Sequence, residues 1–375
     1  MGGPGLGFWV AGTLVSTTPS IHDNSTMADS APALGEGPSV SVVVPVLDGA
    51  AFLGQCLDSI LAQTYPLHEV IVMDDGSTDR TPEIVASYGD RIRYVRQPVT
   101  KGIYANANDG IALASGELIA VFHADDVYLP EMLAREVAWL QRHPDAAVVF
   151  CSDIFIDING RELDRLELPQ DVRGSKPLDY PMVLNALLKY TNVFLRTPTA
   201  LVRASVYREL GAYRAEALKN TAELDMWLRI ARKHKMGTLE ERLILRRRHE
   251  SSSAGRYHRL RTDRFRFFDI MDAELAGEGR DVATADALRD YEAHKAVDTV
   301  LRAVNHYILG NRSEARTVLG EASLKSLARS ARIQRGRMLV LAITLHALVR
   351  LPRIDAVRRL FARHWYGSAA PADSG

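Results

Sequence analysis

Residues 121–126 have the sequence Val-Phe-His-Ala-Asp-Asp, an apolar run that ends in two adjacent acids. A second run of this kind, Val70-Ile-Val-Met-Asp-Asp75, lies earlier in the chain. A buried strand that ends in ionised carboxylates is costly unless the acids have a partner. Divalent metal ions take oxygen ligands and bring phosphate groups with them. The two runs together therefore indicate a site for a metal ion and a nucleoside diphosphate.

The segments around these runs alternate between strand and helix patterns. We expect strands over 40–46, 69–73, 91–95, 117–123 and 146–151. Apolar spacing predicts helices over 51–64, 103–114 and 130–142, and a further helix that begins at Thr81-Pro82. Alternation of this kind predicts an open, largely parallel sheet with helices on both faces. Ligands bind outside the carboxyl ends of such strands, where both acidic pairs fall.

The remainder of the chain divides into a less regular part and a helical part. Helical patterns occur over 178–190 and 223–233, and a strand pattern over 243–248. From about Arg259 onward, apolar residues recur at helical spacing. Because Ser and Gly dominate residues 251–255, we interpret them as a connector. We expect a leader over 1–38, an α/β domain over 39–255 and a C-terminal helical region over 256–375.

The first 38 residues are rich in Gly, Ser, Thr, Pro and Ala, which predicts a disordered leader. No Lys or Arg precedes its mildly apolar segment, and the first basic residue of the chain is Arg80. A secretory signal begins with basic residues, so we expect no export, and Met27 is an alternative start. Cys56 and Cys151 lie in apolar stretches and suit reduced thiols of a cytoplasmic protein.

Charge is balanced over the whole chain but uneven along it. Lys+Arg and Asp+Glu both total 46, so no overall charge favours nucleic acid, and we expect no such partner. Ten basic residues lie between Glu321 and Tyr366, where only Glu321 and Asp355 oppose them. They are Lys325, Arg329, Arg332, Arg335, Arg337, Arg350, Arg353, Arg358, Arg359 and Arg363.

Residues 321–366 also contain an apolar run, 338–349, that is too short to span a bilayer. A spanning helix needs about 20 apolar residues. A short apolar run flanked by arginines can instead lie in the interface of an anionic membrane. A helical hairpin packed on the α/β domain explains the pattern equally well, and the two interpretations are compatible.

Two turns bear on the class of ligand. The turn after the first strand, Val43-Val-Pro-Val-Leu-Asp-Gly49, lacks G-x-G-x-x-G, which argues against a nicotinamide or flavin enzyme. Residues 74–79, Asp-Asp-Gly-Ser-Thr-Asp, do not fit a calcium loop. By themselves they are explained equally well as a turn followed by a helix cap. The second acidic strand end favours the functional interpretation.

The motifs, taken in order, resemble the family 2 glycosyltransferases, which have the GT-A fold. Each motif is weak alone, but their order and spacing are specific. The resemblance extends from about Ser39 to Ser253. It rests on residues 41–49, 59–66, 70–79, 102–110, 114–117, 123–126, 211–213 and 222–229. It implies a metal-dependent, inverting enzyme that moves a sugar from a nucleotide-diphosphate donor to an acceptor hydroxyl.

The resemblance also implies roles for single residues. Asp75 matches the aspartate that hydrogen-bonds the base, and Asp125 and Asp126 match the motif that holds metal and ribose. The metal would be Mn²⁺ or Mg²⁺, bridging the phosphates as a Lewis acid. His249 would be a metal ligand or touch phosphate, with a surface histidine as the alternative. The donor-binding residues are Pro45, Val46, Asp48, Asp75, His123, Ala124, Asp125 and Arg247.

Glu223 aligns with the catalytic base of the family, which is usually aspartate. Such a base takes the proton from the acceptor hydroxyl as that hydroxyl attacks the anomeric carbon. Asp225 is the second candidate. The alternative is that Glu223 only begins a helix, where acids suit the helix dipole.

Four positions depart from the pattern: Asp48, Ala107, His123 and Glu223. The changes at His123 and Glu223 leave a catalytically inactive nucleotide-sugar binder or scaffold as an alternative. A nucleotidyltransferase is another alternative, but it would show a glycine-rich, basic loop after the first strand, and the sequence has none there. A membrane adaptor that works through residues 321–366 is a third alternative. We expect a glycan or lipid-linked acceptor, as in polysaccharide synthesis, and a cytoplasmic location, with peripheral attachment to the inner face of the membrane.

Overall fold

The computed structural model describes residues 37–174, 176–249, 261–333, 337–348 and 359–360. The chain divides into two compact units. Of the described residues, 37–186 and 192–249 form one unit, here called the α/β unit. Residues 187–191 and those described from 261 onward form the other, the helical unit. The predicted leader, up to residue 36, and the predicted connector 251–255 lie outside the described residues, as does Met27.

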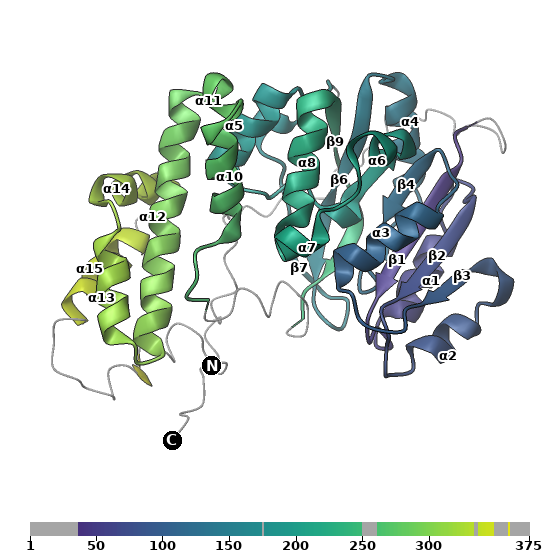
Figure 1. Cartoon of the computed structure of the whole chain (residues 1–375), viewed down its shortest axis with the longest axis horizontal. Helices are drawn as coiled ribbons and strands as arrows, with labels where there is room; N and C mark the ends of the chain where they lie inside the picture. Colours follow the sequence, from purple (N-terminus) through teal and green to yellow (C-terminus); the bar gives the residue numbers. More distant parts are fainter. Residues whose placement is uncertain (1–36, 175, 250–260, 334–336, 349–358, 361–375) are drawn as a thin grey trace, which may run out of the picture. The chain divides into compact units, whose positions relative to one another are not determined.

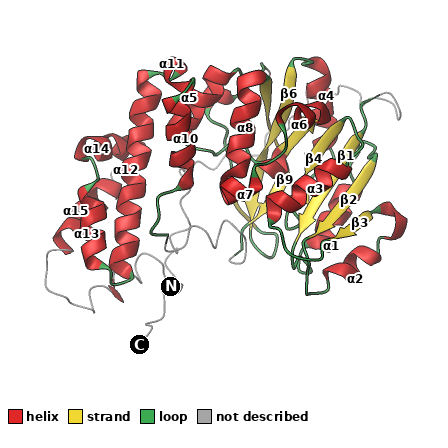
Figure 2. Cartoon of the chain, viewed as in Figure 1, coloured by secondary structure: helices red, strands yellow, loops and turns green. Residues whose placement is uncertain are grey.

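The α/β unit is built on a nine-stranded mixed sheet (Figures 1 and 2). Its strand order is β3-β2-β1-β4-β8-β6-β9-β5, and β7 pairs with β6. The strands are β1 (Val40–Val46), β2 (Glu69–Asp74), β3 (Arg93–Arg96), β4 (Leu118–Val121), β5 (Val127–Tyr128), β6 (Ala146–Ile156), β7 (Glu162–Arg165), β8 (Ala200–Arg203) and β9 (Lys235–Arg247). The α-helices of the same stretch are α1 (Leu53–Leu61), α2 (Thr81–Ala86), α3 (Ile103–Leu113), α4 (Met132–Arg142), α5 (Tyr180–Tyr190), α6 (Ala204–Leu210), α7 (Ala215–Leu218) and α8 (Ala222–Lys233).

The first half of the sheet is parallel, as the alternating pattern predicts. β1 pairs in parallel with both β2 and β4, and β2 pairs in parallel with β3. In this register Val46 lies opposite Asp74, and Val43 lies opposite Val121. The carboxyl ends of β1, β2 and β4 therefore meet at one edge. Both acidic pairs lie there, which confirms their predicted placement.

The second half of the sheet mixes directions. β8 runs antiparallel between β4 and β6, while β6 is parallel to β9. The register between β6 and β9 shifts at several points. Both strands extend beyond their predicted bounds, because such irregularities interrupt the alternation on which a strand prediction depends. Residues 153–250 are therefore more regular than their sequence pattern indicates.

Helices cover both faces of the parallel half. Val40, Val42 and Val44 share one apolar cluster with Leu53 and Ile60 of α1. On the opposite face, Gly110 of α3 lies so close to Val43 and Met73 that a Cβ would stand 2.4 and 2.8 Å from them. Alternate side chains of β1 thus face different helices, as expected for a strand buried on both sides.

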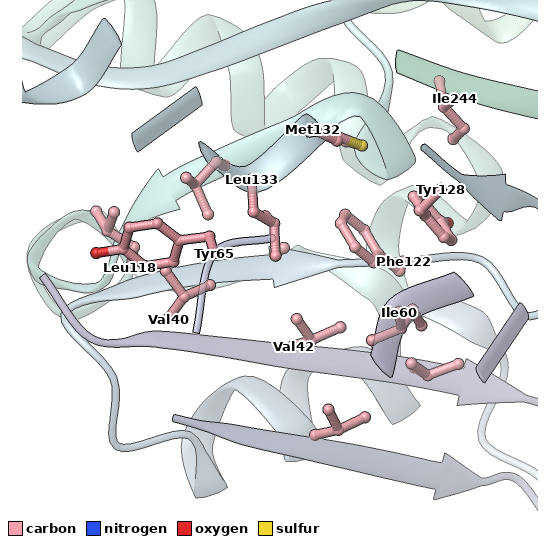
Figure 3. Close-up of a cluster of buried hydrophobic side chains, with 14 of the residues drawn as sticks. Val40, Val42, Ile60, Tyr65, Leu118, Phe122, Tyr128, Met132, Leu133 and Ile244 are labelled. Carbon is pink, nitrogen blue, oxygen red and sulfur yellow. The ribbon is translucent and has the colours of Figure 1, made fainter. Parts of the chain in front are cut away.

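The core holds the end of β4 in place. Figure 3 shows Phe122 and Tyr128 beside Ile60, among side chains from several elements. The Phe122 and Tyr128 rings stack with centroids 3.8 Å apart. Each fully buried side chain of this size contributes about 2–3 kcal/mol. The Tyr128 hydroxyl also accepts a hydrogen bond from the His123 N–H at 2.7 Å. The core thereby orients the residues that follow β4.

The helical unit confirms the prediction of a helical C-terminal region. Its helices are α10 (Arg266–Ala276), α11 (Gly279–Val282), α12 (Ala285–Ile308), α13 (Arg312–Gly320), α14 (Leu324–Ile333) and α15 (Arg337–Leu348). Residues of α12, α13, α14 and α15 form an apolar cluster that includes Val300, Leu319, Leu327 and Leu345. Within the described part of the chain, no helix is both long and apolar enough to cross a membrane.

Candidate active site

The ends of β1 and β2 form one wall of the site. Asp75 N–H donates to the Val46 carbonyl at 2.8 Å, and Pro45 lies opposite Met73. Asp48 follows β1 with a φ of 50°, a left-handed conformation that aspartate tolerates. Its Oδ1 accepts the Thr78 N–H at 2.7 Å. These contacts join the two turns that follow the strands.

Asp74 and Asp75 are buried and hydrogen-bonded to the protein. Asp74 accepts the Ser77 N–H at 2.8 Å and the Tyr94 hydroxyl at 2.5 Å. The two oxygens of Asp75 accept the N–H groups of Lys101 and Gly102, each at 2.8 Å. Asp75 therefore positions the loop that leads into α3.

The acids after β4 have different surroundings from those of Asp74 and Asp75. One potential ligand atom from each of His123, Asp125 and Asp126 lies within 4.8 Å of the others. Asp126 Oδ1 accepts the Arg247 N–H at 2.8 Å, and His123 Nδ1 lies 3.9 Å from Asp126 Oδ2. His123 Nε2 is buried and has no hydrogen-bond partner among the described residues. Ala124 lies between these polar residues and packs against the core cluster.

The electrostatics of this group favour a cation. Burial and the neighbouring charge of Asp125 raise the pKa of Asp126 to about 8. Burial also tends to raise the pKa of Asp125, but the hydrogen bond with His249 and the charges of His123 and His249 hold that pKa below its ordinary value. Burial lowers the pKa of His123, which favours the neutral ring that binds metal ions. An imidazole with a free nitrogen and two carboxylates form a donor set that fits Mn²⁺ or Mg²⁺.

Arg247 and His249 hold this group from β9 and the residues just after it. His249 Nε2 lies 2.9 Å from Asp125 Oδ2, and its ring packs 5.1 Å from that of Phe52. The structure thus places His249 beside the predicted metal ligand Asp125, and His123 completes the compact group. Arg247 donates to the carbonyls of Asp125 and Asp157 and to Gln55 Oε1. Through these contacts its buried guanidinium positions the backbone around Asp125, and the predicted contact of Arg247 with phosphate stays a prediction.

Glu223, at the start of α8, faces the same site. Its Oε2 accepts the Thr197 hydroxyl at 2.8 Å and the Thr197 N–H at 3.1 Å. The Asn192 amide is 3.5 Å from Oε1. Burial, followed by the negative charge of Glu223, raises the pKa of Tyr104 well above its ordinary value. Thr197 was not predicted as a partner because its loop carries no recognisable chemical motif.

Asp225 is less available than Glu223. Its Oδ2 accepts Arg229 Nε at 2.8 Å, and its Oδ1 accepts Arg214 Nη1 at 3.3 Å. Arg229 also donates to the carbonyls of Leu210 and Ala212. Asp225 therefore orients a buried arginine that ties α8 to the end of α6. Of the two acids, Asp225 forms ion pairs with arginines, whereas the described partners of Glu223 are uncharged donors.

Glu223 and the acidic group act on common neighbours. The carboxylates of Glu223 and Asp125 oppose the effect of burial on the pKa of His123. Burial tends to lower the pKa of Arg246, but Asp153, Asp126 and Glu223 together raise it. The Glu223 carboxylate and the group of His123, Asp125 and Asp126 therefore lie within electrostatic range of each other in the α/β unit.

Comparison with known proteins identifies the family. The model described as "Glycosyl transferase family 2" matches residues 41–211. EpsE of Bacillus subtilis, a protein named as a glycosyltransferase, is 31% identical over 52% of this chain and 68% of its own length. The chain belongs to glycosyl transferase family 2. An uncharacterized glycosyltransferase of Rickettsia typhi is 30% identical over 58% of this chain and 66% of its own length. The matches thus span about two thirds of these family 2 relatives.

Solved structures show the same fold. S. aureus TarS 1-349 matches with a TM-score of 0.53 at 16% identity, over 84% of this chain and 93% of that one. The same protein in complex with UDP-GlcNAc matches with a TM-score of 0.51 at 17% identity, over 86% and 92% of the two chains. The prediction of a GT-A fold with an added helical region is confirmed.

Proposed function

We propose that this family 2 member is an inverting glycosyltransferase. It would move a sugar from a nucleotide-diphosphate donor to an acceptor hydroxyl in the synthesis of a polysaccharide, a lipid-linked glycan or another glycoconjugate. The observation that carries the proposal is that the charge of Glu223 acts on His123, which groups with Asp125 and Asp126. Such a site has a base for the acceptor and a cation-binding group for the leaving diphosphate.

The donor would lie along the carboxyl ends of β1, β2 and β4. Pro45, Val46 and Asp48 would line the base and ribose, and Asp75 would hydrogen-bond the base through lone pairs that its loop contacts leave free. His123, Ala124 and Asp125 would line the next part of the donor. The UDP-GlcNAc complex of TarS, which shares the fold, supports a nucleotide-sugar donor.

His123, Asp125 and Asp126 would hold the divalent metal, either Mn²⁺ or Mg²⁺, with His249 as an additional ligand or as the partner of Asp125. The ion, when bound, supplies Lewis-acid stabilisation of the diphosphate charge. Arg247 fixes Asp125 and Asp126 through its own contacts. The two acids therefore remain in place for repeated turnover.

Glu223 would accept the proton of the acceptor hydroxyl. The acceptor oxygen then forms a bond to the anomeric carbon as the bond from that carbon to the diphosphate oxygen breaks. One displacement of this kind inverts the anomeric configuration. The hydrogen bonds from Thr197 hold Oε2, and the longer contact of the Asn192 amide with Oε1 leaves lone pairs for the acceptor hydroxyl.

The proposed location at the membrane rests on the exposed apolar residues of α15 and on the arginines of residues 321–366. A cytoplasmic enzyme at the inner face of the membrane would meet both nucleotide sugars and lipid-linked acceptors. In α15, Val340 and Ile343 are 64% and 60% exposed, which suits an apolar face in a membrane interface. Arg329 pairs with Asp286 and Asp290, so this arginine is not available for lipid headgroups. Arg335, Arg350, Arg353, Arg358 and Arg363 lie outside the described residues.

Calorimetry with nucleotides tests the proposal. UDP, GDP, dTDP and CMP are titrated into the full chain with and without Mn²⁺, beside the Asp125→Ala variant. One diphosphate should bind in a metal-dependent manner, and Asp125→Ala should abolish the metal dependence. Failure of every nucleotide to bind would contradict the proposed function. Tight nucleotide binding without turnover of any sugar donor would instead favour the inactive binder, an alternative that His123 keeps open.

A further inference from the structure

Three arginines gather around one aromatic ring in the α/β unit. The guanidinium carbons of Arg196, Arg246 and Arg248 lie 5.9, 5.1 and 3.6 Å from the centre of the Phe155 ring. They come from the loop before β8, from the end of β9 and from the residue that follows β9. Their convergence is therefore a product of the fold and has no signature in a single sequence motif.

Only one carboxylate is in direct contact with this cluster among the described residues. Asp153 Oδ2 lies 2.7 Å from Arg246 Nη1 and 3.7 Å from Arg196 Nε. Asp153 is 1% exposed, while the side chains of Arg196 and Arg246 retain 17% and 18% exposure, and Arg248 is exposed. No described residue forms an ion pair with the Arg248 guanidinium. The cluster therefore has more positive than negative charge, and part of it is accessible.

Assembly of these cations is unfavourable by itself. Burial, together with the charge of Arg246, lowers the pKa of Arg196 to about 10. Burial also lowers the pKa of Arg248. Guanidinium groups present several N–H donors in a plane and bind phosphate or carboxylate in pairs of hydrogen bonds. An anion at this position would offset the repulsion.

Arg196 links the cluster to the proposed base. It directly precedes Thr197, the residue that holds Glu223, and the charge of Glu223 acts on it. Arg246 is within electrostatic range of Asp153, Asp126 and Glu223. In a single displacement, the base and the leaving diphosphate lie on opposite sides of the anomeric carbon. A charge beside the base therefore faces the acceptor.

We propose that Arg196, Arg246 and Arg248 form a subsite for an anionic group, a phosphate or a carboxylate, carried by the acceptor. The assignment rests on the proposed function and names the class of its acceptor. An anionic glycan or a phosphate-bearing lipid-linked acceptor would fit, whereas a neutral acceptor would leave the cluster uncompensated. Asp153 orients Arg196 and Arg246 without neutralising all three arginines.

The test is a second titration on protein already saturated with Mn²⁺ and the nucleoside diphosphate that binds. The probes are glycerol 3-phosphate, methyl glucuronoside and the neutral methyl glucoside. Both anionic probes should bind at least about tenfold more tightly than the neutral probe. Arg248→Gln and Arg196→Gln should remove that preference and leave the nucleotide affinity unchanged. Arg161→Gln, at an exposed position in the turn before β7, should keep it.

The outcomes distinguish an anionic group on the acceptor from the diphosphate of the donor. Equal binding of anionic and neutral probes would overturn the subsite. A loss of about tenfold or more in nucleotide affinity in Arg248→Gln would assign the arginines to the donor diphosphate instead. Failure of all nucleotides to bind would remove the proposed function itself, a result that the first titration gives separately. Arg248 is exposed, so its variant should keep the fold, which circular dichroism verifies.

Discussion

The acidic pairs after β2 and β4 have the same sequence pattern but different surroundings. Asp74 and Asp75 accept hydrogen bonds from a hydroxyl and from backbone N–H groups. Asp125 and Asp126 lie beside two histidines, and burial with the charge of Asp125 raises the pKa of Asp126 to about 8. The first pair is stabilised by backbone and hydroxyl donors, whereas the second forms, with His123, a group that could hold a metal ion.

The comparison shows that adjacent acids at a strand end do not by themselves identify a metal site. What distinguishes the two pairs is the kind of partner that the rest of the fold supplies. Backbone N–H groups and a hydroxyl surround the first pair, whereas the second pair lies with His123 and His249. The first pair shapes a loop, and the second belongs to a group that could hold a metal ion.

The largest expected effect is on the first pair. Asp74→Ala would leave the Ser77 N–H and the Tyr94 hydroxyl without their acceptor. We expect the free energy of unfolding to fall by about 3 kcal/mol or more. Urea unfolding measures this loss, with Asp74→Asn as the control that keeps one acceptor. A variant as stable as the wild-type protein would show that the donors do not stabilise this pair.

The second effect concerns the cation. Asp126→Asn removes a carboxylate whose charge is disfavoured by burial and by Asp125. The unfolding free energy of the metal-free protein should not fall, while Mn²⁺ affinity should drop by about 100-fold, or about 2.8 kcal/mol. Calorimetry with Mn²⁺ and urea unfolding separate the two quantities. Retained Mn²⁺ affinity would remove the distinction between the pairs.

A third buried acid, Glu136, has neither a strong donor nor a cation beside it. It is fully buried, and burial raises its pKa well above 4.5, with only the Cys151 thiol opposing this effect. The unfolded chain therefore loses this proton first as pH rises. Stability should fall above about pH 4.5 by up to about 1.4 kcal/mol per pH unit.

The neutral variant tests this dependence. Glu136→Gln should be increasingly more stable than wild-type protein as pH rises from 5 to 7, as measured by urea unfolding at each pH. Because glutamine does not titrate, the difference in unfolding free energy between the two proteins reports the contribution of the Glu136 carboxyl group alone. A difference that does not change with pH would show that Glu136 keeps an ordinary pKa.

The smallest effect separates the two acids of α8. Asp225→Asn weakens the contact with Arg229, but Arg229 keeps its bonds to the carbonyls of Leu210 and Ala212. We expect a loss of about 1 kcal/mol in unfolding free energy and turnover near that of wild-type protein. Donor turnover and thermal unfolding measure the two. A severe loss of turnover in a folded Asp225→Asn protein would make Asp225 the base.

The sequence predicts the parallel half of the fold well. β1, β2 and β4 are short, mainly apolar runs, and polar residues soon follow each of them. The placement of Asp75 and Asp126 at one edge follows from parallel pairing alone. These features are local, so a pattern of neighbouring residues contains them.

Other features depend on contacts between distant segments. The direction of β8, which is antiparallel in the middle of the sheet, depends on the path by which the chain returns to the sheet. The register shifts between β6 and β9 interrupt the alternation of side chains between the two faces. The contact of Thr197 with Glu223 joins residues 26 positions apart, and that of Arg247 with Gln55 joins residues 192 apart. The charge of Arg247 is visible in the sequence, whereas its acceptors in the fold are not.

The most direct test of the account is donor turnover in Glu223→Gln. Release of nucleoside diphosphate from nucleotide sugars is measured with Mn²⁺, beside Glu223→Asp, which keeps a carboxylate. Glu223→Gln should bind the nucleotide as wild-type protein does and lose turnover by about 100-fold or more, while Glu223→Asp retains part of it. Turnover equal to that of wild-type protein in Glu223→Gln would contradict the assignment of Glu223 as the base of this site.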